Sequence, residues 1–177
     1  MIIHTLGPEQ TDSYAAALVY QHQHSVADCQ IVLHPSFDAL YHHLADYPSD
    51  YLLVPAAYRS RAGLSWGDLH YRYLNQLTLV DSLITQLDPL VLVQDPQRAR
   101  AVVYTHAATA DLARQHLPGN VRLELAPSKY LAYQAFRRYG GYALVSQKLV
   151  DPTAGVRILQ HFPARMLWSV YLIEKQN

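Results

Sequence analysis

Short apolar runs alternate with amphipathic stretches along this chain, and that pattern predicts strands alternating with helices. The apolar runs have the length and the Val, Ile and Leu content of buried strands, and they cover residues 1–3, 29–33, 51–55, 77–80, 90–93, 101–104, 121–125, 142–145 and 167–173. Helices are predicted after residues 11–13, after Ser36, over 105–116, from Ser128 to Gly140 and over 146–150. Residues 155–162 indicate an extended segment, and 62–75 give no clear pattern. This order favours an α/β fold in which mainly parallel sheets carry helices on both faces.

The first turn, residues 5–13, joins the apolar start of the chain to a helix-forming run. Gly7-Pro8 ends the strand, and Thr11, Asp12 and Ser13 are all favoured at helix N-caps. A helix N-terminus presents unpaired N–H groups and the positive end of the helix dipole, so it can bind an anion. The alternative is an ordinary capped turn without a ligand, and most turns of this kind are of that type.

The balance of charge and apolar residues limits the class of protein. Of the 177 residues, 50% are hydrophobic and 16% are charged, so we expect one folded domain or two small lobes with a substantial core. Lys and Arg number 14, as do Asp and Glu, so the chain lacks the basic excess of a general nucleic-acid binder. No apolar run approaches the length of a membrane span, and the start lacks the basic region of a signal peptide. We therefore expect a cytoplasmic protein that binds neither nucleic acid nor membrane.

The placement of cysteine and histidine argues against a metal site. A lone Cys29 excludes an internal disulfide and a cysteine zinc cluster. His42 and His43 are adjacent in a predicted helix, so they point in different directions and make a poor metal pair. His22 and His24 are interpreted in the same way, as surface residues.

Several short segments, in order, resemble the catalytic domain of the prephenate dehydratase family. Thr5-Leu6-Gly7-Pro8-Glu9-Gln10-Thr11-Asp12-Ser13 is similar to the family's opening Gly-Pro-x-Gly-Thr-x-Ser, and it is closer still to the Thr-Leu-Gly-Pro-Glu-Gly-Thr of the bacilysin-pathway prephenate decarboxylases. Further segments resemble family motifs in the same order: Ser36-Phe37, Val54-Pro55-Ala56-Ala57-Tyr58, Tyr104-Thr105-His106, Pro127-Ser128-Lys129 and Met166-Leu167-Trp168-Ser169-Val170-Tyr171. The resemblance covers essentially the whole chain, although only the opening motif is fairly specific.

The resemblance implies a two-lobed fold of the type II periplasmic-binding-protein kind. It predicts a single prephenate dehydratase-like domain, with no regulatory ACT domain. Lobe 1 would hold residues 1–86 and 159–177, and lobe 2 residues 87–158. Extended connections around 82–89 and 155–162 would cross between the lobes, and the ligand is expected between them.

Four departures from the family pattern bear on the activity. Gln10 replaces a glycine of the opening motif, and Ala56-Ala57-Tyr58 stands where dehydratases have Glu-Asn-Ser. Thr105-His106-Ala107 replaces the decarboxylase Ser-His-Pro turn. Met166-Leu167-Trp168 replaces the dehydratase Thr-Arg-Phe, whose Thr is regarded as the key catalytic residue. Methionine has no proton to donate and cannot replace that Thr as an acid.

The resemblance therefore implies a lyase acting on prephenate, without metal or cofactor, in aromatic amino acid or bacilysin-like antibiotic biosynthesis. Loss of the Thr favours a non-aromatising decarboxylase over a dehydratase. It is equally compatible with a catalytically inactive protein that binds aromatic-pathway carboxylates. A dehydratase that uses different residues is a third, weaker alternative. The expected partner is a small-molecule carboxylate such as prephenate, and homo-oligomer formation is left open.

The residues expected at the site follow from the same resemblance and from the chemistry of carboxylates. His106 is the candidate for proton transfer, and the alternative is a turn histidine bonded to the backbone. The candidates for substrate binding are hydroxyl, guanidinium and aromatic side chains, namely Thr11, Ser13, Tyr58, Arg59, Ser128, Arg165 and Trp168.

Overall fold

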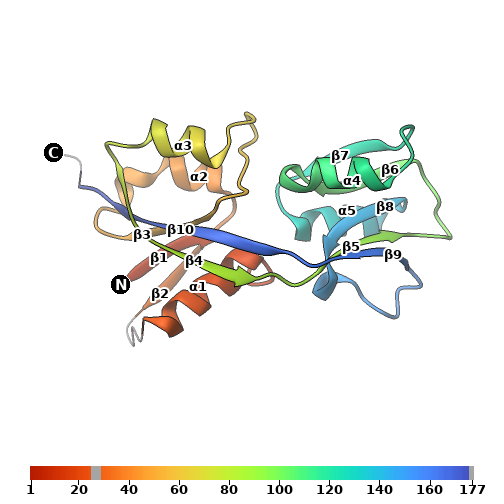
Figure 1. Ribbon diagram of the computed structural model, residues 1–177, viewed down its shortest axis with the longest axis horizontal. Helices are drawn as coiled ribbons and strands as arrows, with labels where there is room; N and C mark the ends of the chain where they lie inside the picture. The colour runs from red at the N-terminus through yellow and green to blue at the C-terminus, as the bar shows by residue number, and fades with distance from the viewer. Residues whose placement is uncertain (25–28, 176–177) are drawn as a thin grey trace. The chain divides into compact units, whose positions relative to one another are not determined.

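The chain forms two compact units, each with its own sheet. A computed structural model describes residues 1–24 and 29–175. Unit 1 comprises Met1–Gln86 and Arg165–Asn177, and unit 2 comprises Leu87–Ala164 (Figure 1). None of the described helices is long and apolar enough to cross a membrane.

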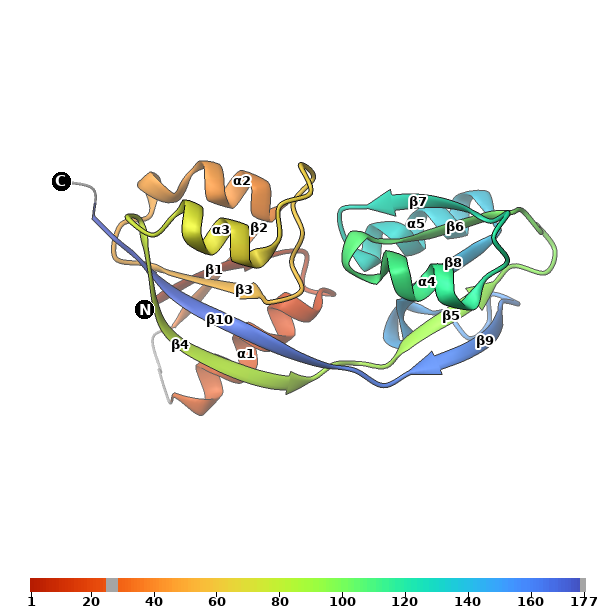
Figure 2. The same ribbon diagram turned by 45° about the horizontal axis from the view of Figure 1, so that its top comes forward.

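Unit 1 is built on a five-stranded sheet with the order β2-β1-β3-β10-β4. Its strands are β1 Ile2–Leu6, β2 Gln30–His34, β3 Tyr51–Pro55, β4 Leu77–Gln86 and β10 Arg165–Ile173. β1 pairs in parallel with β2 and β3, whereas β10 is antiparallel to both β3 and β4, so four of the strands share one direction. Helix α1, Asp12–Gln23, lies on one face, and α2, Phe37–His42, and α3, Trp66–Arg72, lie on the other (Figure 2). A short 3-10 helix, Leu44–Asp46, follows α2.

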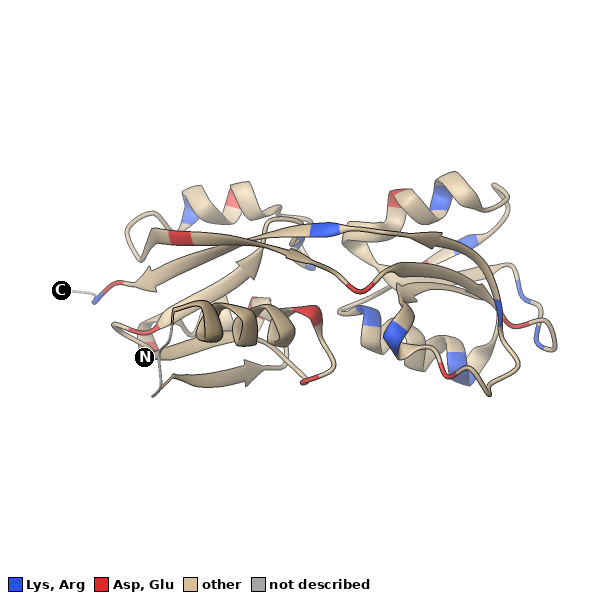
Figure 3. Cartoon of the chain, turned by 60° about the horizontal axis from the view of Figure 1, so that its bottom comes forward, with Lys and Arg blue, Asp and Glu red and all other residues tan. Residues whose placement is uncertain are grey.

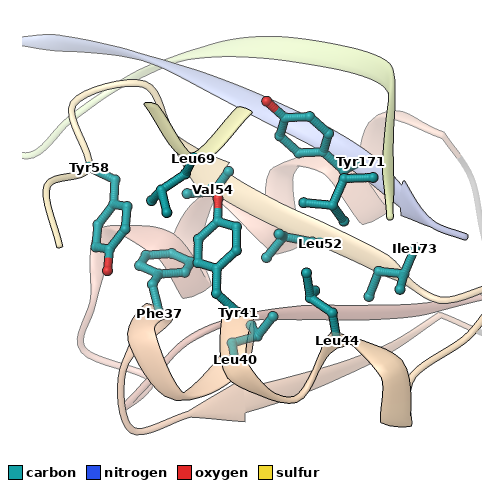
Figure 4. Close-up of a cluster of buried hydrophobic side chains, with 11 residues drawn as sticks. Phe37, Leu40, Tyr41, Leu44, Leu52, Val54, Tyr58, Leu69, Tyr171 and Ile173 are labelled. Atoms are coloured by element: carbon teal, nitrogen blue, oxygen red, sulfur yellow. The ribbon is translucent and has the colours of Figure 1, made fainter. Parts of the chain in front are cut away.

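The core of unit 1 lies between the sheet and helices α2 and α3. Leu52 and Val54 alternate with Leu53 along β3, so they point to the α2 side, as Figure 4 shows. The cluster around them consists of Phe37, Leu40, Tyr41, Leu44, Tyr58, Leu69, Leu77, Tyr171 and Ile173. The central strands β1 and β3 are buried on both faces, which explains their continuous apolar runs, whereas most of β4 is exposed.

Unit 2 repeats this plan with the strand order β7-β6-β8-β5-β9. Its strands are β5 Leu90–Gln94, β6 Val102–His106, β7 Arg122–Ala126, β8 Tyr142–Ser146 and β9 Arg157–Phe162. Only β5 runs against the others. The helices are η2 Ala107–Thr109, α4 Ala110–His116, α5 Lys129–Tyr139 and η3 Gln147–Leu149. Val91 and Val93 pack with Phe136 of α5, whereas Leu90 and Leu92 pack with Ala113 of α4, because successive side chains of a strand point to opposite faces.

The expected α/β organisation, with two lobes that each hold a mainly parallel sheet flanked by helices, is confirmed, with local differences from the predicted elements. The 62–75 stretch contains α3, which Ser65 caps through a reciprocal capping box with Asp68. The predicted 105–116 helix is divided, because His106 ends β6 and the α-helix begins only at Ala110. The segments expected to be extended connections are largely strands, since β4 continues to Gln86 and β9 pairs with β5.

Candidate functional site

In unit 1, the predicted site residues lie at the edge of the sheet where β1 and β3 end, here called the carboxyl edge of unit 1. Thr11 and Ser13 follow β1 through the opening turn, and Tyr58 and Arg59 follow β3. β10 begins at this edge, because Trp168 is the register partner of Pro55. Parallel strands of an α/β sheet place their ligand loops at this end.

Thr11 is the N-cap of α1, and its hydroxyl is already used within the turn. Its Oγ1 accepts the N–H of Tyr14 at 3.2 Å and donates to the carbonyl of Leu6 at 2.8 Å. Its own N–H donates to the carbonyl of Pro8 at 3.0 Å. The predicted cap is confirmed, and Thr11 therefore shapes the turn rather than offering free donors to a ligand.

Ser13 is the donor that the α1 N-terminus leaves available. The residue is only 4% exposed. No hydrogen bond among the described residues uses its N–H or its hydroxyl. Both groups are therefore placed to donate to an anion at the positive end of the helix dipole.

The other aromatic and cationic candidates of unit 1 divide into buried and exposed groups. Tyr58 packs its ring on Phe37, with 4.9 Å between ring centroids, and belongs to the core (Figure 4). Burial and then the Asp38 carboxylate raise the pKa of Tyr58, so it is neutral near pH 7. Arg59 is exposed in the loop after β3, where it forms an isolated bridge with Ser65.

β10 carries the two remaining candidates of unit 1 in different environments. Trp168 is 1% exposed, and its indole N–H donates to Thr85 Oγ1 at 2.8 Å. The structure therefore places Trp168 in the core rather than on a ligand-facing surface. Arg165 is exposed at the start of the strand, opposite Gln86 of β4.

In unit 2, His106 and Ser128 lie at the corresponding carboxyl edge. His106 ends β6, and its register partner is Ala126, the last residue of β7. Ser128 follows two residues later as the N-cap of α5, with its Oγ accepting the N–H of Leu131 at 3.2 Å. The structure thus brings these two residues to the ends of neighbouring strands.

His106 is held as a neutral imidazole with a defined tautomer. Its Nδ1 accepts the N–H of Ala108 at 3.2 Å, which leaves the ring proton on Nε2. Burial, and then the positive charge of Lys129, lower the pKa of His106 to about 4. The imidazole can therefore donate a hydrogen bond through Nε2, but it is not a charged acid near pH 7. The backbone contact matches the alternative interpretation of a turn histidine.

A pH titration of His106 by NMR should show protonation near pH 4, well below the pKa of 6.5 of an ordinary histidine. Because the unfolded chain binds this proton at higher pH, stability should decrease as the pH falls from about 6.5 to about 4. Lys129→Gln should raise the pKa of His106, since it removes the second cause of the shift. Lys148→Gln is the control, and it should leave the pKa of His106 unchanged. An unshifted His106 would contradict the geometry described for this edge.

Lys129 is a further candidate, although in the sequence it belongs only to the family-like segment Pro127-Ser128-Lys129. It is the first residue of α5, where a cation is unfavourable because it meets the positive end of the helix dipole. A cation at this place offers a partner to an anionic ligand. A lysine directly after a helix N-cap such as Ser128 is unfavourable, and this feature of the sequence could have identified Lys129 as a candidate.

The neutral charge of the chain conceals an uneven distribution. Unit 2 holds nine of the 14 Lys and Arg residues but five of the 14 Asp and Glu residues, and unit 1 holds the reverse. Figure 3 shows blue segments concentrated in unit 2. Unit 2 is therefore the more favourable environment for an anion. In the described part of the chain, no three His, Cys, Asp or Glu residues are grouped so that they could hold a metal.

Comparison with solved structures identifies the fold class. A prephenate dehydratase from Arthrobacter aurescens in complex with L-Phe superposes with a TM-score of 0.62 at 15% identity, covering 99% of this chain and 61% of that one. A prephenate dehydratase from Staphylococcus aureus subsp. aureus Mu50 gives 0.60 at 13% identity, covering 99% and 67%. A periplasmic His/Glu/Gln/Arg/opine family-binding protein from Silicibacter pomeroyi, in complex with lysine, gives 0.56 at 11% identity, covering 98% and 82%.

These similarities define a protein with the fold shared by prephenate dehydratases and periplasmic binding proteins. The expected relation to prephenate dehydratases is thereby confirmed at the level of the fold. No protein-family model and no curated protein sequence matches the chain. The chain spans about 61% of the length of the Arthrobacter dehydratase.

Proposed function

We propose that this protein is a prephenate-type lyase, and that it acts as a non-aromatising decarboxylase rather than as a dehydratase. The fold likeness to prephenate dehydratases over 99% of the chain supports the substrate class. The observation that carries the choice of reaction is Met166, which stands where the family resemblance places the dehydratase Thr. A thioether cannot protonate a leaving hydroxyl group.

The chemistry of prephenate explains why this residue matters. Loss of the ring carboxylate as CO2 leaves an electron pair that must be accepted. In a dehydratase the pair expels the ring hydroxyl, which needs a proton from a positioned acid. In a decarboxylase the hydroxyl stays, and a ring carbon takes the proton instead. An enzyme without an acid at the hydroxyl favours the second route.

Each carboxyl edge, considered by itself, carries donors that suit an organic acid. Ser13 would bind a carboxylate through its N–H and hydroxyl, and Ser128 lies at a second helix N-terminus. The Nε2–H of His106 would donate to an oxygen of the ligand. Arg59 and Arg165 are exposed cations that would contribute charge-assisted contacts.

A non-catalytic carboxylate-binding protein is the second candidate. The lowered pKa of His106 favours this second candidate. His106 is the imidazole that the family resemblance suggests for proton transfer, and it is uncharged near pH 7. Such a protein would keep the donors of the carboxyl edges and lose turnover.

Incubation with prephenate separates these functions. NMR and ultraviolet spectra should show loss of prephenate and formation of a non-aromatic product. Phenylpyruvate as the main product would reject the decarboxylase in favour of a dehydratase. A thermal shift with prephenate but no turnover would support the binding protein. The absence of both a shift and turnover would reject the whole substrate class.

Ser13→Ala should weaken binding of prephenate by about 1–3 kcal/mol, the effect of removing one hydrogen bond to a charged group. The measurement is isothermal calorimetry at fixed salt concentration. Ser36→Ala is the matched control, since Ser36 caps α2 through the N–H of Ala39 and has no proposed role in binding. Equal affinity of the Ser13 variant and the wild type would remove the α1 N-terminus from the site.

A further inference from the structure

Three polar side chains of unit 1 form a chain of hydrogen bonds that neither the family resemblance nor the proposed function uses. His4 Nε2 lies 3.0 Å from Asp50 Oδ2, and His4 Nδ1 lies 2.8 Å from His34 Nε2. His4 is in the middle of β1 and is 3% exposed, whereas His34 ends β2 and is half-buried. Asp50 immediately precedes β3. Because β1 lies between β2 and β3, the sheet brings together residues that are far apart in the sequence.

The Asp50 carboxylate determines which ring nitrogen of His4 and of His34 carries the proton. An ionised carboxylate only accepts hydrogen bonds, so His4 must donate through Nε2 to Asp50. A neutral imidazole has one N–H group, so His4 Nδ1 is an acceptor. His34 must then donate through Nε2, and its Nδ1 carries an unshared electron pair. Asp50 thus sets the tautomer of His34 through His4, as carboxylates do for metal-bound and catalytic histidines.

The surroundings hold the two rings and favour the neutral form. Tyr47 stacks on His4, with 4.2 Å between ring centroids, and meets His34 edge-on at 5.5 Å. Burial, and then the electrostatic influence of the neighbouring His4 and His43, lower the pKa of His34. No hydrogen bond among the described residues uses His34 Nδ1. The electron pair on that atom is therefore available to an incoming donor.

We propose that Asp50, His4 and His34 form a proton relay in which Nδ1 of His34 is a general base for a water molecule or a ligand hydroxyl group. When the base acts, the O–H bond breaks, its electron pair stays on oxygen, and the proton bonds to Nδ1. The positive charge on His34 is stabilised through its Nε2–H and His4 by the Asp50 carboxylate. His34 also lies beside the opening turn, because the N–H of Gly7 donates to its carbonyl at 2.9 Å. The relay is independent of prephenate.

The first test is a long-range ¹H–¹⁵N spectrum of the full chain labelled at histidine nitrogens, recorded near pH 7.5. We expect His4 and His34 both to carry their proton on Nε2. A His34 with its proton on Nδ1 would overturn the proposal, because that atom could not then accept a proton.

The second test uses hydrolysis of p-nitrophenyl acetate as a probe of base strength. His34→Gln should lower the protein-dependent rate by about fivefold or more, since a positioned base contributes ~10²-fold or more and the other histidines supply a background. Asp50→Asn should lower it as well, because a neutral amide does not stabilise the charged relay. His42→Gln, at an exposed histidine, and Asp46→Asn, at a carboxylate that bonds His43 instead, should leave the rate unchanged. A wild-type rate in the folded His34 variant would overturn the proposal.

Discussion

Trp168→Ala should lower the free energy of unfolding by about 3–5 kcal/mol, the usual cost of removing a large aromatic side chain from a core. The side chain is 1% exposed in the structure, so the substitution leaves a cavity that its neighbours cannot fill completely. It also leaves Thr85 Oγ1 without the donor that now lies 2.8 Å away. Urea denaturation followed by circular dichroism measures the change.

Two variants separate these causes of the loss. Trp168→Phe retains most of the apolar volume and removes the indole N–H, so it should cost less, about 1–3 kcal/mol. Leu167→Ala changes a neighbour on β10 that is 43% exposed, and it should cost less than about 1 kcal/mol. If Trp168→Ala kept wild-type stability and lost only ligand binding, Trp168 would be a substrate-binding residue and its placement in the core would be contradicted.

Gly140→Ala should destabilise unit 2 by about 3 kcal/mol or more, because both backbone conformation and space oppose a side chain there. Gly140 ends α5 with φ of 76° and ψ of −166°, in a region that essentially only glycine occupies. An added Cβ would lie 2.5 Å from the backbone oxygen and from the Cβ of Arg98. Arg98 cannot easily move, since its side chain bonds Asp95 and the carbonyl of Arg138.

Gly155→Ala is the matched control for this substitution. Gly155 also has a positive φ, of 66°, but no atom lies within 4 Å of an added Cβ. Its substitution should therefore cost only the conformational penalty, about 1–2 kcal/mol. Thermal unfolding of the two variants under one condition provides the comparison. If both variants lost equal stability, the close approach of Arg98 to an added Cβ at position 140 would not contribute to the destabilisation.

The local signals in the sequence predicted the local structure well. Ser36, Ser128 and Thr11 cap helices as expected, because a cap depends on residues only three positions apart. The capping box of Ser65 and Asp68 was present in the sequence as well. It was missed because α3 is short and follows a mixed aromatic stretch without a clear period.

The contacts that depend on strand register could not be predicted in this way. His4 meets His34 and Asp50 across 30 and 46 positions of sequence, and only the sheet order brings them together. Trp168 was expected to contact a ligand, since it lies in a family-like motif, but its strand directs it into the core. A motif identifies the position of a residue along the fold, whereas the packing determines which way its side chain points.

The most direct test of the proposed ligand class is a titration of the ¹⁵N-labelled full chain with prephenate, followed through backbone amide resonances. We expect saturable shifts at the donors of a carboxyl edge, which are Ser13 in unit 1 and His106 and Ser128 in unit 2, each unit being considered by itself. Residues far from these edges in the fold, such as Gly155, should not shift. The absence of saturable shifts at Ser13, His106 and Ser128 with millimolar prephenate would contradict the proposed ligand class.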